Sequence, residues 1–496
     1  MTEEEIVRRS IQISSIWEGD LFARQAEAEL LIGYLESIYE RPTQREDARA
    51  YTVAIDAGYG EGKTFFLRRL AEHISLTHPV AFVDAWADDL ADQPMTALAA
   101  TLKEALKDEL DAPEVRSRWK EFMSKSGRVA KIAGIGLAKR GLGILLTAGA
   151  VDAAEEALNQ VDDAVKDAVN EGLAGAGQGL ADDSFAGSGA SSRLMETRIA
   201  QFQEGQAAIS GMKQSLNAVI ASLQNGSTSP PIIIVIDELD RCRPTYAIKL
   251  LEEIKHLFDV KGIIFVFGLH GEQLSHSVSG AYGPGFDGKG YLRRFFRRRY
   301  ALKEPNLIPL LEKIVGSTSI TMDRLSYPYV KFERRSEDIE LPQLISLYMK
   351  AYGLRPRDAF EIVDMLETCM ALSKPETLNL VYLLPLTMGH ILGNSSSKVP
   401  DPINPFNFEY EHYISQTPVY YTPINLAREF EVYGAYNSSE FNAAYGSDPD
   451  NYAIQSIANI QYRKPVNSES LSRVNNYPKL ISTVSRFTLP VATSEV

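Results

Sequence analysis

A β-branched run that ends in glycines and passes at once into a helical pattern constrains the fold more than any other feature of this chain. Residues 51–57, YTVAIDA, predict a strand, and residues 65–74, FFLRRLAEHI, resume helical spacing. The segment between them holds three glycines, Lys63 and Thr64. In such a loop successive backbone N–H groups point at phosphate oxygens, and a cation completes the neutralisation of charge. The order of strand, glycine loop and helix therefore predicts a nucleotide phosphate site.

The loop departs from the pattern G-x-x-x-x-G-K-[ST] at one position, because Ala57 stands where the first glycine is expected. Alanine adds only one methyl group where the backbone can still be extended, and three glycines remain for unusual dihedrals. A glycine-rich turn without nucleotide is the alternative, but Lys63 and Thr64 at the start of a helix argue against it. Lys63 is expected to reach the β and γ phosphates, and Thr64 to ligate Mg²⁺. The predicted phosphate-binding residues are Gly58, Tyr59, Gly60, Glu61, Gly62, Lys63 and Thr64.

A second predicted strand ends in carboxylates. In IIIVIDELDR, at 232–241, an apolar run leads into Asp237, which would lie at the carboxyl end of the strand, where parallel sheets bind ligands. Asp237 is predicted to hold Mg²⁺, and Glu238 to polarise the attacking water as the catalytic base. Asp240 is the competing base. Adjacent carboxylates in a dry strand end are costly without a cation, which argues against a purely structural pair.

Strands and helices alternate along the first 300 residues. Apolar runs at 79–86 and 262–270 predict two further buried strands, and helical spacing at 92–110 and 244–259 separates the predicted strands. This alternation predicts an α/β fold with a parallel sheet flanked by helices.

Length and composition divide the chain into parts. Its 496 residues suffice for about two to four domains. We predict a nucleotide-binding core at 1–305, interrupted at 120–192 by an insertion that is first basic and apolar and then rich in Gly and Ala. Residues 306–390 have a helical pattern and predict a lid-like domain. Residues 391–496 are rich in Asn, Tyr and Pro, and no fold is predicted for them beyond a mainly helical C-terminal region.

The order of four motifs resembles the KAP family of P-loop NTPases, a mostly bacterial group within the STAND-like ATPases. The motifs are AGYGEGKT, VDAW, IDELDRCRPTYAIKLLEEIKHLF and GIIFVFGLHGEQL. The resemblance implies an ASCE-type sheet, in which one strand lies between the phosphate-loop strand and the carboxylate strand, and it implies ATP as the nucleotide. The run at 79–86 is the candidate for an intervening element in sequence, although its place in the sheet is not readable. Glu238 and His270 stand where many members carry aspartate.

Two groups of arginines are candidates for contact with nucleotide. YLRRFFRRRY, at 291–300, holds five arginines around two phenylalanines. We take Arg294 as the candidate finger, in its own chain or from a neighbour, although the pattern does not single out one arginine. A solvated basic helix end and a nucleic-acid patch are the alternatives. Arg357 begins a predicted helix after Pro356 and resembles the sensor-type arginine of the lid in related ATPases, whereas helix capping by Asp358 is the alternative reading of this turn.

The insertion bears on membranes and partners. Residues 132–151 are about long enough to span a bilayer, but Lys139 and Arg140 lie in the middle, and each would cost about 2.5 to 3.5 kcal/mol at the bilayer centre. We therefore expect no spanning helix. An interfacial helix on an anionic membrane and a soluble insertion packed on the protein or on a second copy both stay open. Near-heptad spacing over 151–169 fits a partner helix, so self-association or a protein partner is expected.

Charge and cysteine content limit the class of protein further. A formal net charge of -14 argues against a surface that grips nucleic acid throughout, so nucleic acid is not the favoured partner. Cys242 and Cys369 cannot form a disulfide framework, and the amino-terminal residues lack an apolar run of signal-peptide length. We expect a cytoplasmic protein. Peripheral contact with the inner face of the membrane stays open as an addition to this expectation.

The predicted function is that of a magnesium-dependent, ATP-binding and ATP-hydrolysing switch or motor. The resemblance implies a role in phage or plasmid defence by analogy alone. Two alternatives belong to other classes: a nucleotide-gated, membrane-associated scaffold with little turnover, and a DNA-processing ATPase that uses the arginine cluster.

Overall fold

The chain forms two compact units in a computed structural model. The first comprises Met1–Glu18, Ala26–Ala57 and Phe66–Leu302, and the second comprises Gly19–Gln25, Gly58–Phe65 and Lys303–Val496. The structure describes residues 3–40, 50–91, 93–127, 129, 189–223, 228–332, 335–374, 376–394, 398–414, 416–461 and 473–486.

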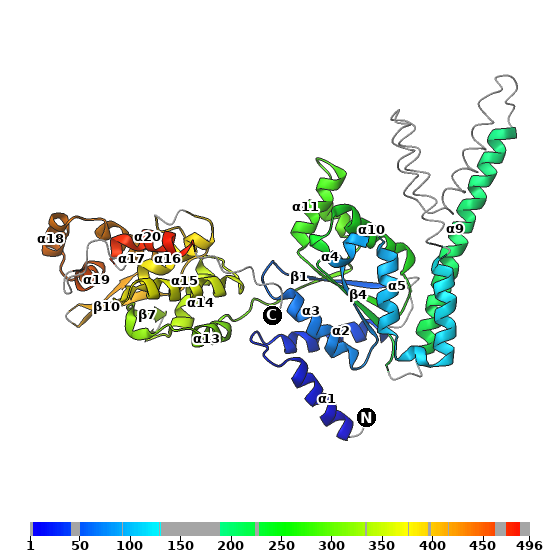
Figure 1. Cartoon of the computed structure of the whole chain (residues 1–496), viewed down its shortest axis with the longest axis horizontal. Helices are drawn as coiled ribbons and strands as arrows, with labels where there is room; N and C mark the ends of the chain where they lie inside the picture. The colour runs from blue at the N-terminus through cyan, green and yellow to red at the C-terminus, as the bar shows by residue number, and fades with distance from the viewer. Residues whose placement is uncertain are drawn as a thin grey trace, which may run out of the picture. The chain divides into compact units, whose positions relative to one another are not determined.

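A five-stranded parallel sheet forms the centre of the first unit (Figure 1). Its strand order is β2-β3-β4-β1-β5, and each neighbouring pair is parallel, so all five strands end at the same edge. The predicted α/β fold with a parallel sheet flanked by helices is therefore confirmed. The strands are β1 (Tyr51–Asp56), β2 (Val80–Asp84), β3 (Ile232–Asp237), β4 (Ile263–Leu269) and β5 (Arg298–Ala301).

The strand between the phosphate-loop strand and the carboxylate strand is β4. It pairs with β1 on one side and with β3 on the other, which is the arrangement that the family resemblance implies. The run at 79–86, the candidate for an intervening element in sequence, is instead the edge strand β2 and pairs with β3.

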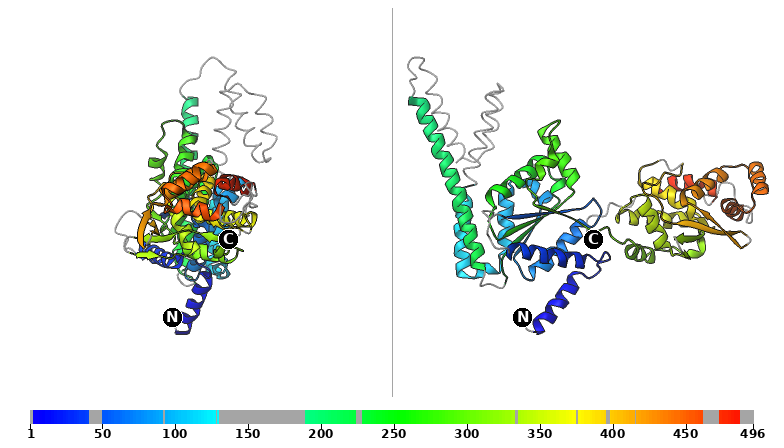
Figure 2. Two further views of the ribbon diagram at one scale, coloured as in Figure 1. Left: turned by 90° about the vertical axis from the view of Figure 1, so that its left-hand side faces the viewer. Right: turned by 180° about the vertical axis from the view of Figure 1, so that it is seen from behind.

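Both faces of the sheet are covered by helices (Figure 2), and strand residues alternate between two hydrophobic clusters. In β3, Ile232, Ile234 and Ile236 belong to the cluster that includes α5, α9 and α10, whereas Ile233 and Val235 belong to the cluster that includes α2 and α3. Burial on both faces explains why β3 and β4 read as unbroken apolar runs and not as alternating ones.

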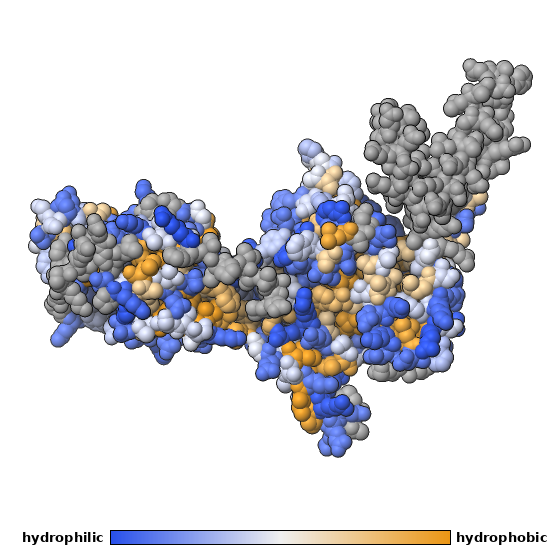
Figure 3. All heavy atoms as spheres, in the orientation of Figure 1, coloured by the Kyte–Doolittle hydropathy of each residue, from blue (hydrophilic) through white to orange (hydrophobic). Residues whose placement is uncertain are grey.

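The first unit also contains helices and short 3₁₀ turns. Helix α1 buries no residue and exposes Ile6, Val7 and Ile11, and Figure 3 shows apolar surface along it. The helices and 3₁₀ turns include α1 (Glu3–Ile16), α2 (Arg24–Glu40), α3 (Lys63–Ser75), α4 (Ala85–Asp88), η1 (Asp89–Ala91), α5 (Pro94–Ala105), η2 (Glu109–Asp111), α9 (Gly189–Ser222), η4 (Leu239–Arg241), α10 (Pro244–Leu257), α11 (Gly271–Tyr282) and α12 (Gly288–Leu292), and residues 113–127 are helical as well.

The second unit is built on one hydrophobic cluster that runs from Leu307 to Val484, so residues on both sides of position 391 share a core. It holds a four-stranded sheet of order β11-β10-β7-β8 and a pair of short strands, β6 and β9. Its elements are α13 (Ile308–Gly316), η5 (Met322–Arg324), β6 (Leu325–Ser326), β7 (Tyr329–Phe332), β8 (Arg335–Glu337), α14 (Leu341–Ala351), α15 (Asp358–Leu372), β9 (Leu378–Asn379), α16 (Leu380–Ile391), β10 (Glu409–Ile414), β11 (Thr417–Tyr421), α17 (Pro423–Gly434), α18 (Ser438–Ser447), α19 (Tyr452–Gln461), η6 (Val474–Asn476) and α20 (Tyr477–Val484).

The predicted interfacial segment, 132–151, and the near-heptad segment, 151–169, lie outside the described residues. Among the helices that the structure does describe, none combines the length and the apolar character needed to cross a bilayer.

Candidate functional site

The glycine loop joins β1 to α3, and the backbone conformation of Ala57 is one that alanine can adopt. Gly60 and Gly62 both have a φ of +79°, a conformation that residues with a side chain rarely adopt. Ala57 does not have a positive φ. Ala57 extends the strand by one residue, since its N–H donates to the Leu269 carbonyl at 3.3 Å. The departure from the glycine pattern therefore falls at a position whose backbone conformation does not require glycine.

Lys63 and Thr64 are the first two residues of α3, where backbone N–H groups have no partner within the helix. The Lys63 side chain is buried, and its ammonium nitrogen lies 5.9 Å from the centroid of the Tyr59 ring. Thr64 is half-buried. A buried cation and the amides at a helix start are the groups that an anionic phosphate chain requires.

The carboxylate strand ends at the same sheet edge as β1. Asp237 is the last residue of β3 and is 1% exposed, and its Oδ1 accepts from the backbone N–H of Glu238 at 2.9 Å. Glu238 adopts the left-handed conformation, with a φ of 60° and a ψ of 26°, which is uncommon for a residue with a side chain. This turn ends the strand and changes the direction of the backbone between Asp237 and Glu238.

The pKa of the Glu238 carboxyl is raised, although opposing influences act on it. Burial raises the pKa of its carboxyl, the Arg241 guanidinium lowers it, and Asp237, Asp84 and Asp240 add smaller increases. Oε1 of Glu238 lies 2.8 Å from Nη1 of Arg241, and the Glu238 side chain keeps 15% of its surface exposed. Asp240, the competing base, is 5% exposed and lies in the turn η4. Solvent therefore has better access to Glu238 than to Asp240.

Two further acids lie at the same edge and were not among the predicted ligands. Asp84 ends β2 directly opposite Asp237, and its Oδ1 accepts from the Ala87 N–H at 3.0 Å. Asp56 ends β1 and accepts from the Gly271 N–H at 2.9 Å. The signal was present in the sequence, because β1, β2 and β3 each end in aspartate.

Gly268 makes the close packing around Asp237 possible. It lies in the fully buried strand β4, between β3 and β1. A Cβ atom at this position would come 2.1 Å from Cδ1 of Leu67 and 2.7 Å from Oδ1 of Asp237. A glycine inside an apolar strand is the sequence signal for such an approach, and Gly268 is not among the residues predicted from the sequence.

Arg294 lies in the segment that leads into β5. Arg294 precedes β5, whose first residue, Arg298, pairs with Val53 of β1, and the Phe295 carbonyl accepts from the Thr52 hydroxyl at 2.5 Å. Residue 294 therefore lies at the amino edge of the sheet, whereas the loop follows the carboxyl edge. The finger role of Arg294, in its own chain or from a neighbour, stays a proposal.

Arg299 is the arginine of this cluster that points toward the carboxyl edge. Its Nη1 lies 3.9 Å from Oδ2 of Asp56, the residue before Ala57. The Arg299 side chain is 34% exposed. Sequence reasoning could not separate it from Arg297 and Arg298, because strand register decides which of three consecutive arginines reaches this edge.

Arg357 and its neighbour Arg355 contact the glycine loop inside the second unit. Arg357 is the N-cap residue of α15, and a Cβ atom built on Gly60 would come 3.0 Å from Cβ of Arg357. The side-chain hydrogen bond to the loop comes from Arg355, whose Nη1 donates to the Tyr59 carbonyl at 2.8 Å. Asp358 accepts from the Arg355 backbone N–H at 2.7 Å. Arg355 is not among the residues predicted from the sequence.

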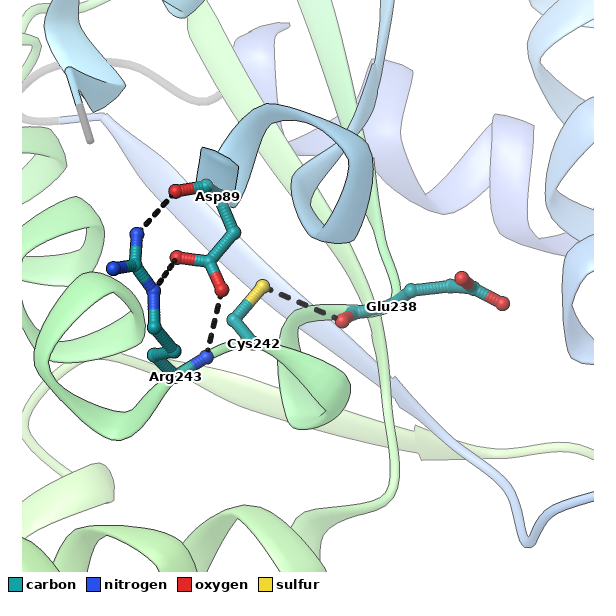
Figure 4. A network of polar contacts seen from close by, with 4 residues as sticks. All are labelled: Asp89, Glu238, Cys242 and Arg243. Carbon is teal, nitrogen blue, oxygen red and sulfur yellow. Dashed lines mark hydrogen bonds and ion pairs between the residues drawn. The ribbon is translucent and has the colours of Figure 1, made fainter. Parts of the chain in front are cut away.

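His270 and Cys242 have structural contacts. Nδ1 of His270 accepts from the Gln273 N–H at 3.2 Å, so this residue caps α11. The Cys242 thiol donates to the Glu238 carbonyl at 3.6 Å, as Figure 4 shows, and burial raises the pKa of the thiol to about 12. Cys242 therefore lacks the exposed, low-pKa character of a nucleophile.

The solved structures that the chain resembles include two with low sequence identity. The Aeropyrum pernix ORC2 protein, in its ADPNP–ADP complexes, is 11% identical, with 95% of this chain and 98% of that chain covered and a TM-score of 0.30. The C. elegans PCH-2 structure is 10% identical, with 77% and 72% covered and a TM-score of 0.28. These scores are too low to support any statement about function.

No curated protein matches the chain. The KAP family P-loop domain matches residues 27–299, which include both the glycine loop and the carboxylate strand. The match covers more than half of the 496 residues. The chain therefore belongs to the KAP family of P-loop proteins.

Proposed function

We propose that this chain is a magnesium-dependent ATPase that acts as a nucleotide-driven switch or motor. One observation carries the proposal: β1 and β3, separated only by β4, end at the same sheet edge, so the loop that leads into Lys63 and the Asp237–Glu238 pair follow the same edge. Membership of a P-loop family supports nucleotide binding and hydrolysis in general.

The residues of the site divide the work of phosphoryl transfer among them. Backbone amides of the loop and the Lys63 ammonium neutralise the phosphate charge. Glu238 orients the attacking water, and its access to solvent makes it a better base than Asp240. Catalysis of this kind depends on positioning and electrostatics, because the protein forms no covalent intermediate.

The donor set fits Mg²⁺, which would stabilise charge on the phosphate oxygens when bound. Asp237 and the Thr64 hydroxyl would hold the ion, and Asp84 opposite Asp237 would hold one of its waters. Among the described residues, no group of three or more His, Cys, Asp or Glu side chains forms a metal cage. This fits a Mg²⁺ ion that keeps several waters and takes other ligands from the nucleotide.

Asp237→Asn is expected to lower phosphate release by about 100-fold, because a neutral amide no longer balances the ion. The Mg²⁺ concentration for half-maximal turnover should rise as well. The measurement is phosphate release from ATP against free Mg²⁺, with EDTA as the blank. The control is Asp108→Asn, an exposed aspartate whose side chain makes no cap hydrogen bond. Identical Mg²⁺ curves for Asp237→Asn and the control would contradict the assignment.

A DNA-processing ATPase is the second candidate function. The observation that favours it is the exposure of all five arginines between 293 and 299. Salt-sensitive binding of single-stranded DNA together with DNA-stimulated turnover would support this candidate.

Roles in phage or plasmid defence, in a membrane-associated scaffold and in self-association rest on family analogy or on segments outside the described residues. We keep them as hypotheses about biological context, separate from the chemistry of the site.

A further inference from the structure

The guanidinium of Arg241 lies between the proposed base and an exposed tryptophan. Arg241 follows Glu238 by three residues in the turn η4, and its Nη1 lies 2.8 Å from Oε1 of Glu238. Its Cζ lies 5.5 Å from the centroid of the Trp86 ring. A guanidinium over an indole face gains cation–π attraction and loses little conformational freedom, because both groups are planar.

Trp86 lies in α4, directly after β2, and 53% of its surface is exposed. The large apolar surface of a tryptophan ring favours contact with a partner group over exposure to water. Its place follows from the strand pairing, since β2 is the direct neighbour of β3, which ends at Asp237. The Trp86 ring and the Arg241 side chain therefore come from two adjacent strand ends.

The segment that carries Trp86 is tied to the start of α10. Asp89, which is 7% exposed, accepts from the backbone N–H and from Nε of Arg243, both at 2.9 Å. Nη2 of Arg243 also donates to the Asp89 carbonyl, and Figure 4 shows these contacts together. Arg241 in η4 and Arg243 at the start of α10 thus connect the chain after β3 to the segment after β2 in two ways.

Figure 4 shows the Glu238 carboxylate pointing away from Asp89 and Arg243, while the Glu238 carbonyl faces Cys242. The left-handed backbone of Glu238 sets the starting direction of the side chain. The ion pair with Arg241 is the contact that then fixes the position of the carboxylate.

We propose that Arg241, held over the Trp86 indole, is a positioning residue that fixes the Glu238 carboxylate for the attacking water. The inference rests on the proposed function, because it assigns Arg241 a role through Glu238. Arg241 itself contacts neither nucleotide nor water in this role.

The kinetic test is a double-mutant cycle on the full chain. Arg241→Ala is expected to lower kcat by about tenfold with KM for ATP unchanged, because a charge-assisted hydrogen bond is lost and phosphate binding is not. Arg241→Lys should retain part of the rate. Trp86→Phe, which keeps an aromatic face, should lose less than Trp86→Ala. In a Glu238→Gln background, Arg241→Ala should have no further effect, because its effect passes through the carboxylate. The control is Arg116→Ala, an exposed arginine that forms an ion pair with Asp111.

A second readout does not depend on turnover. The chain has three tryptophans, and Trp17 and Trp119 are only 4% and 5% exposed, so acrylamide quenching reports mainly on Trp86. Trp86→Phe should remove the quenchable component and so confirm this assignment. Arg241→Ala and Glu238→Ala should both increase quenching, because each frees the ring face from a fixed guanidinium. Arg116→Ala should leave quenching unchanged.

The outcomes separate this inference from the proposed function. An active Glu238→Gln variant would overturn both, because Glu238 would then have no role for Arg241 to support. An inactive Glu238→Gln with a fully active Arg241→Ala would overturn only the positioning role. Equal losses from Arg241→Ala in both backgrounds, or a raised KM, would assign Arg241 to another task. Unchanged quenching in Arg241→Ala and Glu238→Ala would overturn the contact itself.

Discussion

Lys63→Ala is expected to weaken ATP binding by at least about 30-fold, since loss of one partner of a buried charge pair costs about 2 kcal/mol or more. Lys63 is 9% exposed and begins α3, so its ammonium would meet the phosphates where water screens charge poorly. Turnover should fall with the binding. Titration with a fluorescent ATP analogue measures the affinity, and phosphate release measures the rate.

The matched control for this variant is Lys107→Ala. The Lys107 side chain is 72% exposed and pairs with Glu104, so its removal should change neither affinity nor rate. Thermal melting of both variants shows whether they are folded. A folded Lys63→Ala variant that binds ATP as tightly as Lys107→Ala would contradict the role of Lys63 in phosphate binding.

Gly268→Ala is expected to damage stability and activity together. The new methyl group would overlap Leu67 on one side and the Asp237 carboxylate on the other, at 2.1 and 2.7 Å. Overpacking of a buried site costs about 1 to 3 kcal/mol, which corresponds to a fall in melting temperature of about 2 to 12 °C in a unit of this size. Phosphate release should fall as well, because Asp237 must shift to make room.

Gly280→Ala is the control, because this glycine lies in α11 and a Cβ atom there would meet no atom within 4 Å. Alanine is the better helix former, so this variant should melt at or slightly above the temperature of the wild type. Melting curves and phosphate release for the two variants give the comparison. A Gly268→Ala protein with wild-type melting and turnover would show that the contact around Asp237 is not tight.

The local elements of the first unit were predictable because their signals are local. Residues 51–57, 79–86 and 262–270 were predicted as strands, and the structure has β1, β2 and β4 in these ranges. Lys63 was predicted at a helix start and begins α3. Burial on both faces of the sheet leaves unbroken apolar runs in the sequence.

The order of the strands was not predictable, because it depends on pairing between residues far apart in the chain. Strand β2 precedes β3 in the sequence of the core but lies at the sheet edge, and β4 takes the central place. The same limit applies to the position of Arg294 relative to the sheet edges. A cluster of arginines marks a stretch of chain, but only the pairing of Val53 with Arg298 shows which arginine faces which edge.

Some contacts of Glu238 follow from local sequence signals, and others depend on residues that are far apart in the chain. The motif predicted Asp237 and Glu238 as a pair at a strand end, and β3 does end at Asp237. The contact of Arg241 with Trp86 joins residues from two strands, and no periodicity in the sequence indicates it. In the second unit, pairing of β7 with β10 joins residues on both sides of position 391, which a local pattern could not indicate.

Steady-state ATP hydrolysis by the wild type and by Glu238→Gln, with nucleotide binding measured in both, tests the central claim most directly. Glu104→Gln serves as the control, because the Glu104 side chain is 77% exposed. We expect turnover in the wild type and in the control, and we expect Glu238→Gln to bind ATP and to hydrolyse it only at a small residual rate. Binding with negligible turnover in all three proteins would favour a nucleotide-gated scaffold, and undiminished turnover in Glu238→Gln would contradict the assignment of the base.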